Sequence, residues 1–328
     1  MSVGEILNSN PEYWMTIDNN VLNHLGINLY SNIPAVLSEV VANSWDADAN
    51  NVRVTSEDEC ITIEDDGCGM TKDEINRKYL TVGYRRRRTK EDDETPSGRP
   101  IMGRKGIGKL SLFSIANVIE IVSRRDAQKS GCILNVKDIQ ESIKSGKNEP
   151  YCPMPISPDN IDLQKDGTRI VIRELRGDFN RTPIYLRRRI ARRFGILGDK
   201  WNFNVTINGD VVSIADRDYF HKMQYILCYG DHSDAERYLE YCSKYGNIVE
   251  FDDNHEASIE AQGHRYRITG WIGTVRNSTD LKEKEESLNK IIIMTRGKLA
   301  QEDILAEFGE GGVYARYVTA KSMPISWT

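Results

Sequence analysis

The sequence lacks the features that define several common protein classes. None of its six cysteines forms a C-x-x-C pair and none of its five histidines has metal-ligand spacing, so no zinc site is expected. No apolar run approaches the length of a membrane span. Without a signal peptide, reduced thiols in the cytoplasm are the default expectation. The formal net charge of -5 argues against a protein that coats nucleic acid.

What the chain does have is three polar motifs in a fixed order. Residues 39–46 are EVVANSWD, residues 65–70 are DDGCGM and residues 103–111 are GRKGIGKLS. Each motif alone would be a weak signal. Together they supply polar groups for a metal ion and water, a pocket for a base, and a glycine-rich cradle for phosphates.

The first motif is predicted to lie on a helix over residues 32–49, with Pro34 near its start, where a missing N–H costs least. Glu39, Asn43 and Asp46 would then share one face. The Asn43 carbonyl oxygen suits Mg²⁺, which prefers oxygen ligands. Glu39 could accept a proton from an attacking water. The alternative is an ordinary solvated polar face.

The second motif follows the alternating residues 60–64, which predict a strand entering a turn. Gly67 and Gly69 permit positive φ and a close approach of the backbone to a ligand. Asp65 would lie at the strand end, where its carboxylate could accept a hydrogen bond from the exocyclic amine of adenine. An ordinary Asp-Gly turn is the alternative.

The third motif places glycines at 103, 106 and 108 before a predicted helix over residues 109–116. Backbone N–H groups at such a helix start form a ready anion site. The spacing differs from that of a Walker A loop. A dinucleotide fingerprint also fits poorly, because these glycines follow two earlier motifs instead of the first strand.

In order and spacing the motifs resemble the N-box, G1 and G2 motifs of the GHKL ATPases, the superfamily of gyrase B subunits, the ninety-kilodalton heat-shock chaperone, histidine kinases and MutL. The resemblance covers roughly residues 25–175. It implies an α+β fold, with a GHKL (Bergerat) α/β sandwich over residues 1–195 and a smaller α/β transducer-like domain over residues 196–328. It also implies ATP and Mg²⁺ as ligands, with Asn43 on the metal. The implied ATP contacts are Asn43, Asp46, Asp65, Gly67, Gly69, Met70, Gly103, Lys105, Gly106, Ile107, Gly108, Lys109 and Thr168, the last from a pair similar to the family's final motif.

The resemblance also discriminates within the superfamily. Glu39 stands where histidine kinases usually have asparagine, which favours ATP hydrolysis over phosphotransfer. Residues 25–30, 46–49 and 297–299 look closest to bacterial stand-alone ATP-binding proteins and MORC-type ATPases. An ATP-dependent homodimer is then expected, with a partner protein or DNA as candidate targets. The alternative is a nucleotide-sensing module with little catalysis that acts through a partner chain.

Two basic clusters leave alternatives open. Residues 80–104 contain an arginine run followed by an acidic, Pro/Gly-rich tract, which predicts an exposed, mobile segment. In the family this position is the ATP lid. The run could meet phosphates, or be a solvated charge run. A second cluster on a predicted helix is a DNA-facing stripe or, more commonly, a lid-supporting or interdomain salt-bridged helix; it comprises Arg187, Arg188, Arg189, Arg192 and Arg193.

The last third of the chain predicts a different organisation. Residues 203–212 predict a hairpin, and residues 216–245 a helical insertion, set at about 214–260. Residues 265–273 and 290–294 predict strands, followed by a helix from Gln301. In a transducer domain a lysine from a strand-to-helix loop reaches the γ-phosphate. Lys298 fits that role best and Arg296 second, with a plain surface lysine as the alternative.

Overall fold

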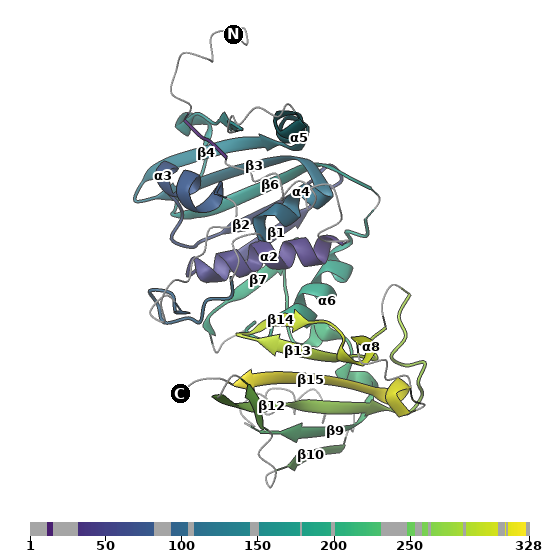
Figure 1. Cartoon of the computed structure of the whole chain (residues 1–328). Coiled ribbons are helices and arrows are strands. Elements are labelled where there is room, and N and C mark those ends of the chain that lie inside the picture. Colours follow the sequence, from purple (N-terminus) through teal and green to yellow (C-terminus); the bar gives the residue numbers. More distant parts are fainter. Residues whose placement is uncertain are drawn as a thin grey trace. The chain divides into compact units, whose positions relative to one another are not determined.

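The computed structural model describes residues 12–15, 32–81, 93–103, 108–144, 151–177, 179–197, 201–230, 248–252, 258–261, 264–284, 287–307, 312 and 314–325. The chain divides into two compact units (Figure 1), the first from Met1–Leu186 and Gly198–Val212, the second from Arg187–Leu197 and Ser213–Thr328. A boundary at residue 195 was expected. Instead, residues 187–197 belong to the second unit, and the predicted hairpin belongs to the first because its strand β7 pairs with β1.

The first unit is built on an eight-stranded sheet in which β1 and β7 are parallel and the other neighbouring strands are antiparallel. In sheet order the strands are β5 (Met154–Pro155), β4 (Gln128–Asn135), β3 (Ala116–Arg125), β6 (Gly167–Leu175), β2 (Cys60–Asp65), β1 (Asn51–Ser56), β7 (Asn204–Ile207) and β8 (Asp210–Val211). The strand predicted over 60–64 is confirmed, with Ile61 and Ile63 buried.

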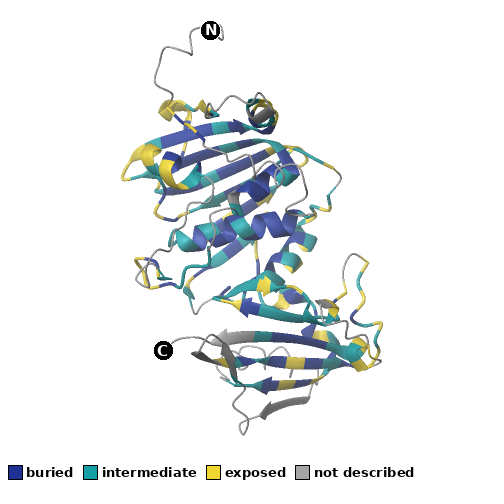
Figure 2. Ribbon diagram, viewed as in Figure 1, coloured by how far each residue is buried: buried dark blue, intermediate teal, exposed yellow. Residues whose placement is uncertain are grey.

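Helix α2 (Ile33–Asp46) carries the first motif. The Asn32 side chain caps it by accepting from the Ala35 N–H at 2.9 Å, and Pro34 lies in the first turn, where it removes no helical hydrogen bond. The helix ends earlier than predicted because Asp48 adopts a positive φ of 58°. Most of α2 is buried (Figure 2), and Trp45 packs edge-on against Phe203 at 5.2 Å. This burial fixes the position of its polar face.

The helix predicted over residues 109–116 is confirmed in place but not in form. A 3₁₀ turn, Gly108–Ser111, leads into the short helix α4 (Leu112–Ile115), and β3 then begins at Ala116. The remaining helices that start in this unit are α3 (Lys72–Glu74) with its π-helical extension Ile75–Tyr79, α5 (Val136–Lys144) and α6 (Pro183–Arg193). Helix α6 continues into the second unit from Arg187.

The second unit contains a seven-stranded sheet. Its strands are β10 (Ile248–Asp252), β9 (Met223–Tyr229), β12 (His264–Val275), β15 (Val318–Ile325), β13 (Ile291–Thr295) and β14 (Lys298–Gln301) in sheet order, with β11 (Ser258–Ala261) paired to β12. Trp271 packs there with Tyr219 and Phe220 in a buried core. The strands predicted over 265–273 and 290–294 are confirmed.

Two predictions for this unit are wrong. The expected helical insertion at about 214–260 contains strands β9, β10 and β11, with 3₁₀ turns at Ala215–Arg217 and Phe220–Lys222; residues 231–247 lie outside the described residues. In β9, buried Ile226 and Cys228 flank exposed Leu227, a strand alternation too short to stand out among charged residues. Gln301 ends β14, and the helix that follows is α8 (Ile304–Glu307). No helix among the described residues is long and apolar enough to cross a membrane.

Candidate functional site

The fold brings the three motifs together around the C-terminal half of α2. A Cβ at Gly108 would collide with the carboxylate of Glu39, so the third motif lies directly against the first. A Cβ at Gly67 would lie 2.7 Å from the Ala47 carbonyl oxygen, so the second motif also approaches the end of α2 closely. At Gly67 the neighbour is a backbone carbonyl that leaves room only for glycine, whereas at Gly108 an added Cβ would displace the end of the Glu39 side chain.

The Asp65 carboxylate accepts hydrogen bonds from three protein donors. The Ser44 hydroxyl donates to Oδ2 at 2.8 Å, and the N–H groups of Gly67 and Thr168 donate to Oδ1 at 3.0 and 3.2 Å. A carboxylate offers about four acceptor positions. Among the described residues, these donors therefore leave one position on Oδ2 that an external N–H donor could fill.

Burial dominates the electrostatics of Asp65. Although the residue as a whole keeps some exposed surface, desolvation of its carboxyl group raises its pKa from 3.8 to about 6. The hydrogen bonds from Ser44, Gly67 and Thr168 oppose this shift, because they favour the ionised form. At neutral pH the group is therefore an ionised, poorly hydrated acceptor that gains from one more donor.

Asp66 has a different environment and a different task. Its carboxylate accepts from the N–H groups of Asn50 and Asn51 at 2.8 and 2.7 Å and from Asn51 Nδ2 at 2.7 Å. Desolvation raises its pKa, but the hydrogen bonds from Asn51 and Asn50 outweigh it, so the pKa lies below its usual value. Asp66 therefore fastens the start of β1.

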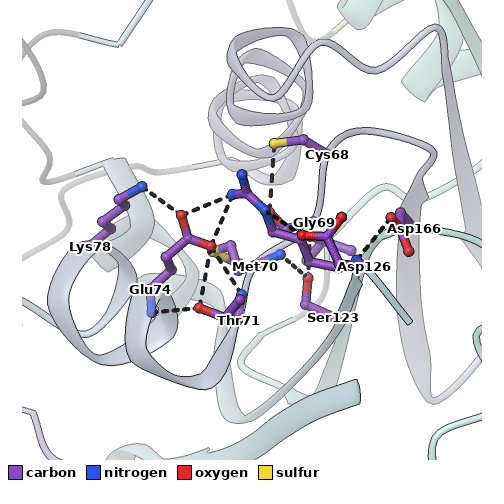
Figure 3. Close-up of polar contacts among 11 residues, drawn as sticks. Cys68, Gly69, Met70, Thr71, Glu74, Lys78, Ser123, Asp126 and Asp166 are labelled. Atoms are coloured by element: carbon purple, nitrogen blue, oxygen red, sulfur yellow. Dashed lines mark hydrogen bonds and ion pairs between the residues drawn. The ribbon is translucent and has the colours of Figure 1, made fainter. Parts of the chain in front are cut away.

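The turn after Asp65 is held by a residue that sequence reasoning missed. Gly69 has a φ of 64°, and a Cβ there would strike the carbonyl oxygen of Arg124. The Met70 N–H donates to Ser123 Oγ at 2.8 Å (Figure 3), and Ser123 Oγ lies 3.0 Å from Thr168 Oγ1. Ser123 is fully buried and continues the face of β3 on which Ile119 and Ile121 are buried, and a polar residue at the end of such an apolar alternation is a signal that could have identified it.

A salt-bridge network supports the segment after this turn. Thr71 and Glu74 form a capping box at the start of α3, and Arg125 on β3 donates to both Glu74 oxygens at 2.8 and 2.9 Å. Lys78 donates to Glu74 Oε1 at 2.7 Å (Figure 3). Desolvation opposes ionisation of Glu74, but Lys78, the Thr71 N–H and Arg125 together lower its pKa. The network ties the second motif to β3.

Asp46 binds the start of the third motif. Its two carboxylate oxygens accept from the N–H groups of Met102 and Gly103 at 2.8 and 2.9 Å. These bonds were not foreseen, because the sequence predicted a ligand contact for both Asp46 and Gly103. The carboxylate holds the start of the glycine-rich segment against the end of α2, and the predicted ligand contacts stay predictions.

The described part of the tract expected to be exposed is partly buried. Arg99 is buried; its guanidinium lies 4.8 Å from the Trp45 ring and donates to Ala49 O and, at 2.7 Å, to Asn50 Oδ1. Trp45 Nε1 donates to Pro100 O at 2.8 Å. The expectation of an exposed segment is therefore met in part for residues 93–103: Glu94 and residues 96–98 are exposed, whereas Thr95 and Arg99 are buried against the end of α2. The expected mobility stays a prediction. Residues 82–92, with the arginine run, lie outside the described residues.

The other predicted site residues fall into three groups. Glu39 and Asn43 are half-buried on successive turns of α2. Lys105, Gly106 and Ile107 lie outside the described residues, as does the side chain of Lys109, whose backbone lies in the 3₁₀ turn. Lys298 belongs to the second unit and begins β14 after a tight turn in which Arg296 and Gly297 have φ of 51° and 80°. The expected strand-to-helix loop is thus a strand-to-strand hairpin.

The arginine-rich helix α6 is ion-paired within the second unit. Arg187 pairs with Asp216 at 3.4 Å, Arg188 with Asp218 at 3.1 Å, Arg192 with Glu283 at 3.0 Å and Arg193 with Glu302 at 3.5 Å. These contacts favour the salt-bridged interpretation of the helix over a DNA-facing stripe.

Known proteins resemble the chain over this site. Residues 30–168 match the family model of the histidine kinase-, DNA gyrase B- and HSP90-like ATPases. A putative type II restriction enzyme, HgiDII of Herpetosiphon aurantiacus, is 35% identical over 312 residues, 94% of this chain and 48% of that protein. The chaperone HtpG of Ruthia magnifica is 30% identical over 125 residues, 31% of this chain and 20% of the chaperone, and HtpG of Bacillus subtilis is 30% identical over 86 residues, 25% of this chain and 14% of the chaperone.

The chain spans about half the length of the restriction-enzyme relative and a fifth or less of these chaperones. The family match covers α2, the turn after β2, the glycine-rich segment and the start of β6, the parts of the chain that hold the three motifs. Residues 30–168 therefore form an ATPase domain of the histidine kinase-, DNA gyrase B- and HSP90-like (GHKL) superfamily.

Proposed function

We propose that the chain binds ATP with Mg²⁺ and hydrolyses it, and that ATP binding closes the lid and promotes dimerisation. Membership of the GHKL superfamily supports ATP binding and a conformational switch. The observation that carries the proposal is the Asp65 carboxylate, ionised at neutral pH, with three protein donors and one acceptor position left. That position matches the exocyclic amine of adenine.

The remaining assignments follow the order of the motifs. Gly67, Gly69 and Met70 would line the adenine side, with Thr168 beside Asp65. Backbone N–H groups of the third motif beyond Gly103, whose own N–H donates to Asp46, would bind the phosphates, as such groups do at glycine-rich helix starts. The side-chain carbonyl oxygen of Asn43 would hold Mg²⁺, which neutralises charge on the phosphates when bound.

Glu39 is the proposed general base. It lies one helical turn before Asn43 on α2, and its carboxylate lies close to Gly108 of the third motif. A base within reach of the attacking water contributes roughly 10²–10⁴-fold. Glu39→Ala should therefore remove most turnover while ATP affinity stays close to that of the parent protein.

A steady-state phosphate-release assay with calorimetry tests this assignment. The exposed Glu59 provides the matched control, and Glu59→Ala should leave turnover unchanged. Normal turnover by Glu39→Ala would contradict the proposed role of Glu39 as general base. ATP binding by the parent protein without multiple turnovers would instead favour a nucleotide-sensing module that acts through a partner chain.

Lys298→Ala in the same assay should lower turnover more than affinity if Lys298 meets the γ-phosphate, and Arg296→Ala should have less effect.

A DNA-directed role is the second candidate. Its support is the 35% identity to a protein named as a putative type II restriction enzyme, which extends over 94% of this chain. Because helix α6 is ion-paired, we assign no DNA-binding surface to its arginines. Turnover measured with and without duplex DNA at low salt tests the idea, since phosphate contacts weaken steeply as salt rises. Absence of both stimulation and binding, with a non-hydrolysable ATP analogue present, would remove DNA from the proposal.

A further inference from the structure

A pocket within the second unit has no role in the proposed ATP site. The space among its lining residues, open solvent included, is about 500 Å³. Its lining combines the apolar and aromatic side chains of Trp271, Tyr219, Leu288 and Leu299 with the basic side chains of Arg189, Arg192, Arg193 and Lys290. The pocket therefore brings aromatic surface and several cations together.

One carboxylate, Glu302, also lines the pocket and pairs with the cations. Lys290 Nζ lies 3.1 Å from Glu302 Oε1, and Arg193 Nη2 lies 3.5 Å from Oε2. Desolvation opposes ionisation of Glu302, but Lys290, Arg193 and Arg189 outweigh it, so its pKa lies below its usual value. The Glu302 side chain is nevertheless 47% exposed, whereas the side chains of Lys290 and Arg193 are 18% and 14% exposed. The anion is thus the outermost member of the group.

One aromatic lining residue carries a polar group without a hydrogen-bond partner among the described residues. Trp271 is buried, and its Nε1–H has no hydrogen-bond acceptor among the described residues. Buried indole N–H groups usually find a partner. In a pocket that also holds several cations, an orphaned donor suits a ligand that brings acceptor oxygens.

We propose that this pocket binds a small organic anion with a flat aromatic body. The body lies against Trp271 and Tyr219, and the acidic group takes the place of the Glu302 carboxylate on Lys290 and Arg193. Glu302 is then an internal competitor that neutralises the cations when the pocket holds no ligand. The ligand class that suits both the aromatic and the basic lining residues is an aromatic carboxylate, sulfonate or phosphate.

Two opposite shifts in affinity test the proposal. The probe is 8-anilinonaphthalene-1-sulfonate, titrated by fluorescence into the whole chain. Glu302→Gln removes the competitor and should tighten the dissociation constant about fivefold, the worth of a partly exposed ion pair. Lys290→Gln removes a cation and should weaken it by a similar factor, whereas Lys290→Arg should keep the parent value. Glu59→Gln and Lys282→Gln, exposed residues with matched charge changes, should leave it unchanged.

Competition identifies the chemical class of ligand. 1-Naphthoate and 1-naphthyl phosphate should displace the probe, and their relative strength tells carboxylate from phosphate preference. The neutral 1-naphthalenemethanol should displace it much less, because it cannot replace Glu302 on the cations. Equal dissociation constants for all variants, a shift in the same direction for Glu302→Gln and Lys290→Gln, or equal competition by the neutral compound would each overturn the proposal.

Discussion

Replacing Asp65 by asparagine should separate ATP binding from folding. The asparagine carbonyl oxygen can keep the two bonds from the N–H groups of Gly67 and Thr168. Its NH₂ group then faces Ser44, whose hydroxyl can accept from it while donating to Val40 O, 3.2 Å away in the parent protein. The substitution is therefore compatible with the local hydrogen bonds of the parent fold, but it presents a donor where adenine would also present one.

The effect on stability follows from the raised pKa. Folding shifts the pKa of Asp65 from 3.8 to about 6, so the folded state binds the proton more tightly between those values. The stability that Asp65 contributes is fully present below about pH 4 and is lost as pH rises through about 6. One pKa unit is worth about 1.4 kcal/mol, so ionised Asp65 costs about 1–3 kcal/mol at pH 7 after allowance for its partial exposure. Asp65→Asn, which carries no such charge, should be more stable than the parent at pH 7 by up to that amount and equal to it near pH 4.

The effect on binding has the opposite sign. Losing a charge-assisted hydrogen bond and leaving two donors opposed should weaken ATP binding at least about 100-fold, or about 2.7 kcal/mol. Calorimetry with ATP measures this loss, and urea unfolding at pH 7 and pH 4 measures the stability. Asp66→Asn is the control, since Asp66 binds Asn50 and Asn51 and has a lowered pKa. It should retain ATP binding and lose stability at pH 7. Equal binding losses, or a larger loss at Asp66, would refute the assignment.

Two further variants test the same site from α2 and from the third motif. Ser44→Ala removes a donor that lowers the pKa of Asp65. Because ATP binding needs the ionised carboxylate, ATP affinity should begin to fall at a higher pH than in the parent protein as the solution is acidified. Calorimetry between pH 5 and 8 checks this with Ser38→Ala, at another buried serine of α2, as control, and a pH profile equal to that of the parent would contradict it. Gly108→Ala places a Cβ against the Glu39 carboxylate and should lower the rate of phosphate release at least about tenfold, as expected when a general base is displaced. Gly312→Ala, where a Cβ meets open space, is the control and should leave the rate unchanged. Parent-like turnover in Gly108→Ala would show that Glu39 tolerates the displacement.

Much of the site could be predicted from local spacing. Glu39 and Asn43 are one turn apart, and the apolar stripe of their helix makes it bury the opposite side. The alternation of residues 60–64 ends the strand at Asp65, and positive φ at Gly69 follows from its lack of a side chain. Helical and strand periods act over a few residues, so a single sequence is enough to read them.

Longer-range features could not be predicted in the same way. The strand of residues 223–229 has only a few alternating positions inside a charged region, and it is a strand because β12 supplies its hydrogen-bond partners. Residues 187–197 belong to the second unit because their arginines and backbone pair there, with Asp216 and Glu283 among the partners. Neither partner is close in sequence, so no local pattern marks the pairing.

The sequence by itself determined that a carboxylate at Asp65, a polar helix face at Glu39 and Asn43 and a glycine-rich segment occur in the order of a GHKL ATPase. Only the tertiary structure decided which of these polar groups hydrogen-bond to one another and which remain available to a ligand. In the folded protein the Asp46 carboxylate accepts hydrogen bonds from the N–H groups at the start of the third motif, and the Ser44 hydroxyl donates to Asp65. The physical reason is that a buried carboxylate must be satisfied by whichever donors the packed chain brings to it, and those donors come from segments far apart in the sequence.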